Sequence, residues 1–124
     1  VMESKNEKRY IHFIVENNSP VYLKEKAILD IIKKYPNFEI NSNNQLTFSD
    51  SLQAFINNNS DVQRMFIIIN TTNIDVAIQK KLSYMIKDKS YQTISLPNNS
   101  KIVVTGNKDN IDKELLGLLV VIDD

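Results

Sequence analysis

The chain has 124 residues, 42% of them hydrophobic, and its 15 basic side chains balance its 15 acidic ones. This length and composition suit one domain with a single buried core. The zero net charge provides no overall field to attract nucleic acid or an anionic membrane, and the lack of cysteine excludes disulfides, a thiol nucleophile and cysteine-bound metals.

The amino-terminal segment carries no sign of export. Residues 1–9 are polar and mixed in charge, so we expect a short tail ahead of a single domain over residues 10–124. The apolar runs elsewhere span only a few residues, far fewer than the roughly 20 that a membrane-spanning helix needs. We therefore expect a soluble, cytoplasmic protein with no membrane contact.

The first third of the chain predicts a strand, a helix and a second strand. Residues 10–15 are β-branched and aromatic, which is typical of a buried strand. Ser19 and Pro20 suit the cap and the first position of a helix, which we expect to end near Tyr35. Residues 37–40 favour a short second strand.

The middle of the chain contains the clearest strand. Residues 47–50 have the spacing of a helix capping box and precede a helix that we expect to end at three consecutive asparagines, residues 57–59. Residues 65–69 are apolar at every position instead of alternating. That pattern is typical of a central strand covered on both faces.

The last third predicts a helix, a hairpin arm, two more strands and a short helix. Asp75 can cap a helix whose apolar side is formed by Val76, Ile78, Leu82, Met85 and Ile86. Residues 91–96 alternate and favour a strand or hairpin arm, and residues 101–105 favour a buried strand that ends at Gly106. A short helix over residues 112–116 and a strand over residues 118–122 complete the expected order.

Strands that alternate with helices indicate a parallel sheet with helices on both faces. We therefore predict an α/β fold: a three-layer α/β/α sandwich whose mainly parallel sheet has five strands, with an extra arm near residues 91–96.

Residues 65–123 resemble the AAA+ ATPases, in particular their MoxR-like group. The features that carry the resemblance are the apolar strand that ends at Asn70 and Thr71, the helix over Leu82, the arm at residues 91–99, and the strand that ends at Gly106 and Asn107. The resemblance implies a P-loop-NTPase-like sheet. It also implies that Asn107 holds the sensor-1 position and that Asn70 and Thr71 stand where the Walker B carboxylates would be.

The residues that would handle nucleotide are missing. A phosphate loop needs glycines, a lysine and a hydroxyl on magnesium, whereas the segment in its expected place, with Asn17, Asn18 and Ser19, contains neither glycine nor lysine. Asn70 and Thr71 carry no negative charge for magnesium or water. The chain also has no arginine in the place of the family's arginine finger, and we expect no helical lid.

These departures predict a catalytically inactive AAA+-like domain that acts through contact with a protein partner, either a related ATPase or a second copy of the chain. We expect no cofactor and no metal. The alternative is a small ligand-binding protein or enzyme that uses the strand ends near Asn17, Asn70 and Asn107 for a substrate other than a nucleotide. A third hypothesis, a nucleic-acid accessory protein, is disfavoured by the zero net charge.

Several residues have both a functional and a structural interpretation, and for each we favour the structural one. Asn107 suits a turn with Gly106, and His12 suits a position in the core or at its rim. Asp123 and Asp124 suit a solvated chain end. The lysines of the first helix are diluted by acidic neighbours, so we do not expect them to bind nucleic acid; they are Lys24, Lys26, Lys33 and Lys34.

Overall fold

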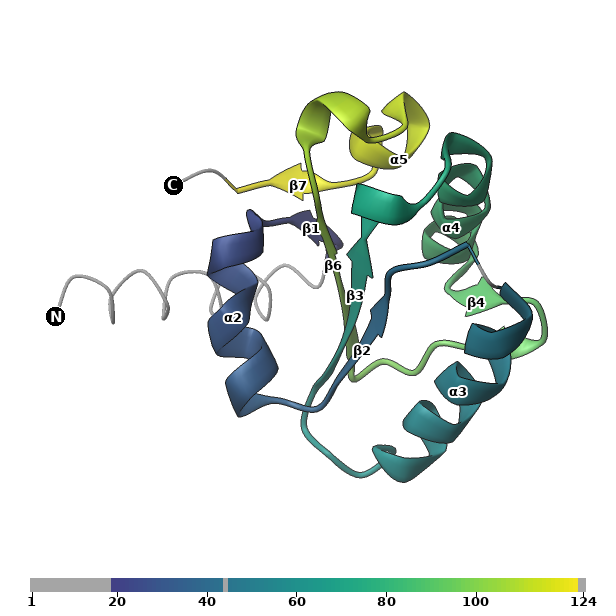
Figure 1. Ribbon diagram of the computed structural model, residues 1–124. Coiled ribbons are helices and arrows are strands. Elements are labelled where there is room, and N and C mark those ends of the chain that lie inside the picture. Colours follow the sequence, from purple (N-terminus) through teal and green to yellow (C-terminus); the bar gives the residue numbers. More distant parts are fainter. Residues whose placement is uncertain (1–18, 44, 123–124) are drawn as a thin grey trace, which may run out of the picture.

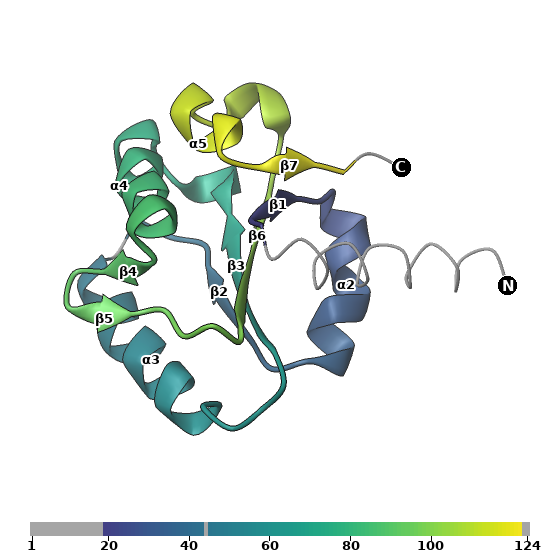
Figure 2. The same cartoon turned by 180° about the vertical axis from the view of Figure 1, so that it is seen from behind.

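The computed structural model describes residues 19–43 and 45–122, which form a three-layer α/β/α fold (Figures 1 and 2). The predicted strand over residues 10–15 and the residues His12, Asn17, Asn18, Asp123 and Asp124 lie outside the described residues. The elements, in chain order, are β1 (Val21–Tyr22), α2 (Glu25–Lys34), β2 (Asn37–Ile40), α3 (Gln45–Asn58), β3 (Met65–Asn70), η1 (Thr71–Asn73), α4 (Val76–Asp88), β4 (Ser90–Tyr91), β5 (Ile94–Ser95), β6 (Ser100–Thr105), η2 (Lys108–Asn110), α5 (Lys113–Gly117) and β7 (Val120–Val121).

The main sheet has five strands in the order β2-β3-β6-β1-β7, and every neighbouring pair is parallel. The longest pairing joins β3 to β6 over six residues, from Met65 opposite Ser100 to Asn70 opposite Thr105. β4 and β5 form a separate antiparallel hairpin. The prediction of a five-stranded parallel sheet with an extra arm is therefore confirmed.

Strand β3 is buried on both faces, as its unbroken apolar sequence predicts. Met65, Ile67 and Ile69 belong to the larger hydrophobic cluster, which also contains residues of α3, α4 and the β4–β5 hairpin. Phe66 and Ile68 belong to the smaller cluster, which they share with α2. Successive side chains of a strand point to opposite faces, so this one strand supplies both cores.

Helix α2 lies on one face of the sheet, and α3 and α4 lie on the other (Figures 1 and 2). The chain leaves β1 for the β2 edge, whereas each later crossover runs in the opposite direction along the sheet. Because crossovers between parallel strands share one hand, a reversal of direction puts the connecting helix on the opposite face. The strand order thus explains why α2 is separated from the later helices.

The structure corrects the predicted start of the first helix. Val21 and Tyr22 form a strand, with Val21 opposite both Val103 of β6 and Val120 of β7. Helix α2 begins only at Glu25, and its N-cap is Lys24, so Ser19 and Pro20 do not start a helix. The two-residue strand gives no periodic signal, and Ser-Pro followed by an apolar stripe is equally typical of a helix start.

Other details of the helices and of the last strand also differ from prediction. Helix α3 begins at Gln45, so residues 47–50 lie inside it instead of capping it. Asp75 is the N-cap of α4 as predicted but makes no side-chain capping hydrogen bond, and Val76 is 50% exposed instead of facing the core. The last strand is shortened to Val120–Val121. Helix α5 spans Lys113–Gly117, one residue later than the predicted 112–116, because Asp112 is its N-cap and its carboxylate accepts from the amides of Glu114 and Leu115.

The two faces of α2 differ sharply in burial, which gives a test of the fold. Ile31 is 1% exposed and Leu29 is 51% exposed on the same helix. We expect Ile31→Ala to lower the free energy of unfolding by about 2–5 kcal/mol, because it leaves a cavity in the core. Leu29→Ala is the matched control and should cost less than about 1 kcal/mol. Chemical denaturation measures both, and equal losses would contradict the assignment of the buried face.

Candidate functional site

The carboxyl ends of the parallel strands form the edge of the sheet where a ligand site is expected. In open α/β sheets, ligands bind outside the carboxyl ends where neighbouring strands send their connections in opposite directions. Here that point lies between β1 and β6, because β1 connects toward β2 and β6 connects toward β7. The candidate site is therefore built from Leu23 and Lys24 after β1, Asn70 and Thr71 at the end of β3, and Gly106 and Asn107 after β6.

Asn70 and Asn107 have the same local role. The side-chain oxygen of Asn70 accepts a hydrogen bond from the Thr72 amide at 3.1 Å, and that of Asn107 accepts one from the Asp109 amide at 3.0 Å. Each asparagine is the N-cap of a single 3-10 turn, η1 or η2. Asparagine favours such turns because its short side chain can bond the backbone two residues ahead. The prediction that Asn107 serves a turn is confirmed.

Thr71 and Gly106 close the space between the ends of β3 and β6. The hydroxyl of Thr71, which is buried, donates to the carbonyl of Thr105 at 2.9 Å. Gly106 has φ +132°, and a Cβ at this position would lie 2.1 Å from the Thr71 hydroxyl oxygen. Only glycine suits this conformation and this contact. The predicted Walker B position Thr71 and the turn before Asn107 are therefore in direct contact.

The end of β1 is also tied to β6. The Tyr22 hydroxyl donates to the Gly106 carbonyl at 2.7 Å, and the amide of Leu23 donates to the Val104 carbonyl at 3.0 Å. The ammonium group of Lys108 lies 5.7 Å from the centre of the Tyr22 ring, within the range of a cation–π contact. The sequence pattern did not identify Tyr22 as part of this edge, because Tyr22 falls inside the helix predicted to start at Pro20.

The connection between the first strand and the first helix is only two residues long. It consists of Leu23, which is fully buried, and Lys24, which is exposed. Ser19 precedes β1 and therefore lies at the amino end of the sheet, opposite Asn70 and Asn107. The structure thus brings Asn70, Thr71 and Asn107 to one edge and does not bring Ser19 to it.

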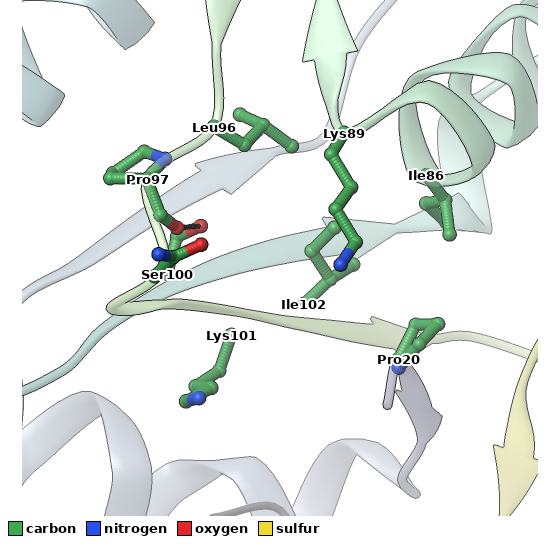
Figure 3. A pocket seen from close by; sticks show the side chains of 9 residues that line it. Pro20, Ile86, Lys89, Leu96, Pro97, Ser100, Lys101 and Ile102 are labelled. Carbon is green, nitrogen blue, oxygen red and sulfur yellow. Dashed lines mark hydrogen bonds between the residues drawn. The ribbon is translucent and has the colours of Figure 1, made fainter. Parts of the chain in front are cut away.

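A small pocket lies at the opposite, amino-terminal side of the sheet (Figure 3). Its volume is about 60 Å³, and it is lined by apolar residues of the hairpin exit, the end of α4 and β6, together with Pro20. The side chain of Lys89 extends toward Ile102, whereas that of Lys101 points away from Lys89 (Figure 3). The pocket has room for only a few water molecules.

Electrostatic shifts occur away from the carboxyl edge. Burial, and then the nearby Arg64 charge, lower the pKa of Lys101 in β6. Burial raises the pKa of Tyr91 in the hairpin. The hydrogen bond from Lys87 to Glu114 raises the pKa of Lys87 on α4, although burial acts in the opposite direction. These groups were not singled out by the sequence, because their shifts come from tertiary neighbours.

The remaining candidates are a metal site, the lysines at α2 and a membrane-spanning helix. Within residues 19–43 and 45–122, no group of three histidine, cysteine, aspartate or glutamate side chains is arranged to hold a metal ion. The α2 lysines are exposed and share the helix with Glu25 and Asp30; they are Lys24, Lys26, Lys33 and Lys34. None of the helices in the described part of the chain is long and apolar enough to span a membrane.

Comparison of the chain with protein-family models, curated protein sequences and solved structures finds no match.

The capping role of the two asparagines can be tested by substitution. We expect Asn70→Ala and Asn107→Ala each to lower the free energy of unfolding by about 0.5–2 kcal/mol, because each removes the acceptor for a turn amide. Asn70→Asp and Asn107→Asp keep that acceptor and should retain most of the stability. Unchanged stability in both alanine variants, measured by chemical denaturation, would contradict the capping role.

The lowered pKa of Lys101 predicts a pH dependence. The folded pKa lies below 10.5, so near that pH the unfolded chain binds more protons at this position than the folded one does. The free energy of unfolding therefore increases as the pH rises from the folded pKa of Lys101 toward 10.5. Lys101→Met removes this contribution.

Denaturation of both proteins across this window should show the wild type gaining stability relative to Lys101→Met as the pH rises. Lys26→Met, on the exposed side of α2, controls for the loss of one positive charge. If the free energy of unfolding of the wild type minus that of Lys101→Met stays constant or falls as the pH rises, the predicted direction is contradicted.

Proposed function

We propose that this chain is a catalytically inactive AAA+-like domain that works as a protein-interaction or regulatory module. Its partner would be a related ATPase or a second copy of the chain. A five-stranded parallel sheet is the architecture that the resemblance implies, and the described residues have it. The role itself is inferred from how the strand ends are used.

The observation that carries the proposal is the connection from β1 to α2. A phosphate loop wraps consecutive free amides around the phosphates and needs glycines to do so. Here two residues join strand and helix, neither is glycine, and the Leu23 amide already donates to Val104. Leu23 is also fully buried, so its backbone is not available to a ligand. This connection leaves no room for a phosphate-binding loop.

The residues at the expected Walker B and sensor-1 positions also support an inactive domain. Asn70 and Thr71, at the end of β3, offer an amide and a hydroxyl where magnesium and water activation require carboxylates. The Asn70 oxygen is bonded to the Thr72 amide, and the Thr71 hydroxyl is bonded to the Thr105 carbonyl. Asn107 has its oxygen bonded to the Asp109 amide. Each group thus stabilises the fold locally instead of facing a ligand.

One observation favours the second candidate, a ligand site for a molecule other than a nucleotide. The hydroxyl of Thr105 is fully buried at the end of β6 and has no hydrogen-bond partner among the residues that the structure describes. Buried polar groups without a partner are uncommon. Against a ligand site there, the neighbouring Asn70 and Asn107 oxygens are occupied by turn amides.

Calorimetric titration with ATP and ADP, with and without magnesium, tests the proposal. We expect no saturable heat at protein concentrations that would reveal a Kd of about 1 mM. Titration of a P-loop ATPase under the same conditions is the positive control. Heat that saturates at one site per chain and is lost in Lys24→Ala would overturn the proposal, because it would show that the two-residue connection holds phosphate.

ATP hydrolysis is the second readout. Activity of the purified protein that disappears on substitution of Asn70 or Thr71 would show that these residues act on nucleotide, and it would overturn the inactive-domain proposal. Activity that survives these substitutions points to a contaminating ATPase.

A further inference from the structure

Helix α4 presents an apolar and basic face that packs against nothing else in the described part of the chain. Val76, Lys80 and Tyr84 recur every four residues, a spacing that places them along one side of a helix. Val76 is 50% exposed and Tyr84 is 53% exposed. The other side of α4 is buried against the sheet through Leu82 and Met85. Two large apolar side chains therefore remain half exposed on a single helix face.

A hollow lies beside Tyr84, between α4 and the β4–β5 hairpin. Its volume is about 320 Å³, several times that of the pocket in Figure 3. Met85 and Tyr91, both buried, contribute apolar lining, while Lys81 and Asp88 contribute charged groups. Such a hollow is large enough for the side chain of a partner protein, and it opens next to the exposed Tyr84 ring.

The middle of this face carries the positive charges of Lys80 and Lys81, whereas Asp75 and Asp88 lie at the two ends of α4. Asp88 is the only acidic residue of α4, whereas the helix contains Lys80, Lys81 and Lys87. Lys87 is paired with Glu114 at 2.7 Å. No ion pair involves Lys80 or Lys81 among residues 19–43 and 45–122. These two ammonium groups are therefore available to carboxylates of another molecule.

Contacts between α4 and the segment around α5 support this face. The Lys87–Glu114 contact joins α4 to α5, and the Lys87 ammonium lies 5.3 Å from the centre of the Tyr84 ring. The buried Gln79 also connects the two segments, because its side-chain oxygen accepts from the Asp112 amide at 2.7 Å and its amide donates to the Ile74 carbonyl at 3.0 Å. An ordered surface loses little entropy when a partner binds.

We propose that Val76, Lys80, Lys81, Tyr84 and the adjoining hollow form a docking surface, the α4 surface, for an acidic segment of a partner protein that carries one large apolar side chain. The apolar side chain enters the hollow beside Tyr84, and flanking carboxylates pair with Lys80 and Lys81. This inference rests on the proposed function and identifies the surface that performs it.

Charge and shape favour a protein segment over nucleic acid. Lys87 is already paired with Glu114, so this face of α4 offers only Lys80 and Lys81 to a phosphate backbone, whose binding depends on many such contacts. The protein as a whole has no net positive charge to concentrate a polyanion. An apolar lining, by contrast, suits an aliphatic or aromatic side chain of a peptide.

The test uses a phage-displayed library of random dodecapeptides selected on the whole protein. Two triple variants are compared with the wild type. The surface variant carries Lys80→Glu, Lys81→Glu and Tyr84→Ser. The matched control carries Lys26→Glu, Leu29→Ser and Lys33→Glu on α2, where Leu29 is 51% exposed. All six positions are exposed, so both variants should keep the fold, which circular dichroism verifies.

We expect enriched peptides in which acidic residues flank one large apolar residue. Synthetic copies should bind the wild type and the control equally and should bind the surface variant at least about tenfold more weakly, a difference of about 1.4 kcal/mol. Amide chemical shifts in the wild type should change at α4 and the hairpin.

Three outcomes would overturn the α4 surface: no enriched sequence, enriched peptides without acidic residues, or equal binding to both variants. If no peptide binds, and single-stranded DNA binds the wild type but not the surface variant, the α4 surface is assigned to nucleic acid instead. Peptides that bind both variants equally would show that another surface binds them. That result would overturn the α4 surface but not the proposed function as a protein-interaction module. Nucleotide binding is tested separately by calorimetry.

Discussion

Burial of β3 on both faces is the constraint on which the rest of the structure depends. Each of its first five residues is fully buried, and each such side chain contributes on the order of 1.5–3 kcal/mol through the hydrophobic effect. Because alternate residues enter opposite clusters, α2 on one side and α3 with α4 on the other are joined through a single strand. A polar side chain at any of these five positions would enter one core or the other, and polarity begins only at Asn70, where the strand ends.

At the carboxyl edge of the sheet, the polar groups that follow β3 and β6 bond within the fold, whereas the buried hydroxyl of Thr105 has no partner among the described residues. Turn amides occupy the asparagine oxygens, Thr71 fills the space that a side chain at residue 106 would need, and Tyr22 binds the Gly106 carbonyl. Sites that act on ligands usually leave polar groups unsatisfied until the ligand arrives. Outward-facing helix surfaces are the other place for a partner to bind, and in the described part of the chain α4 has exposed apolar side chains beside a hollow.

Sequence patterns predicted the central features and missed those that depend on distant contacts. The apolar run of β3, strand β2 and the Gly106 turn were correct because each is a local pattern. Strand β1 was missed because two residues carry no periodicity, and only pairing with Val103 and Val104 makes them a strand. The turn role of Asn107 was predictable, whereas the contact of Thr71 with residue 106 was not. Val76 was assigned to the core because helical spacing cannot reveal where the underlying sheet ends.

The position of β1 between β6 and β7 constrains the order in which the chain can fold during synthesis. Val21 pairs with Val103, 82 residues later (103 − 21), and both strands that lie beside β1 in the described sheet, β6 and β7, come later in the chain. At a translation rate of about 5–20 residues per second, the ribosome needs roughly 4–16 seconds to add those residues. During that time β2 and β3 can associate, but Val21, Tyr22 and Leu23 have no sheet to join. These apolar residues are therefore open to a nascent-chain chaperone while the later strands are made, and they are among the last parts of the described sheet to be buried.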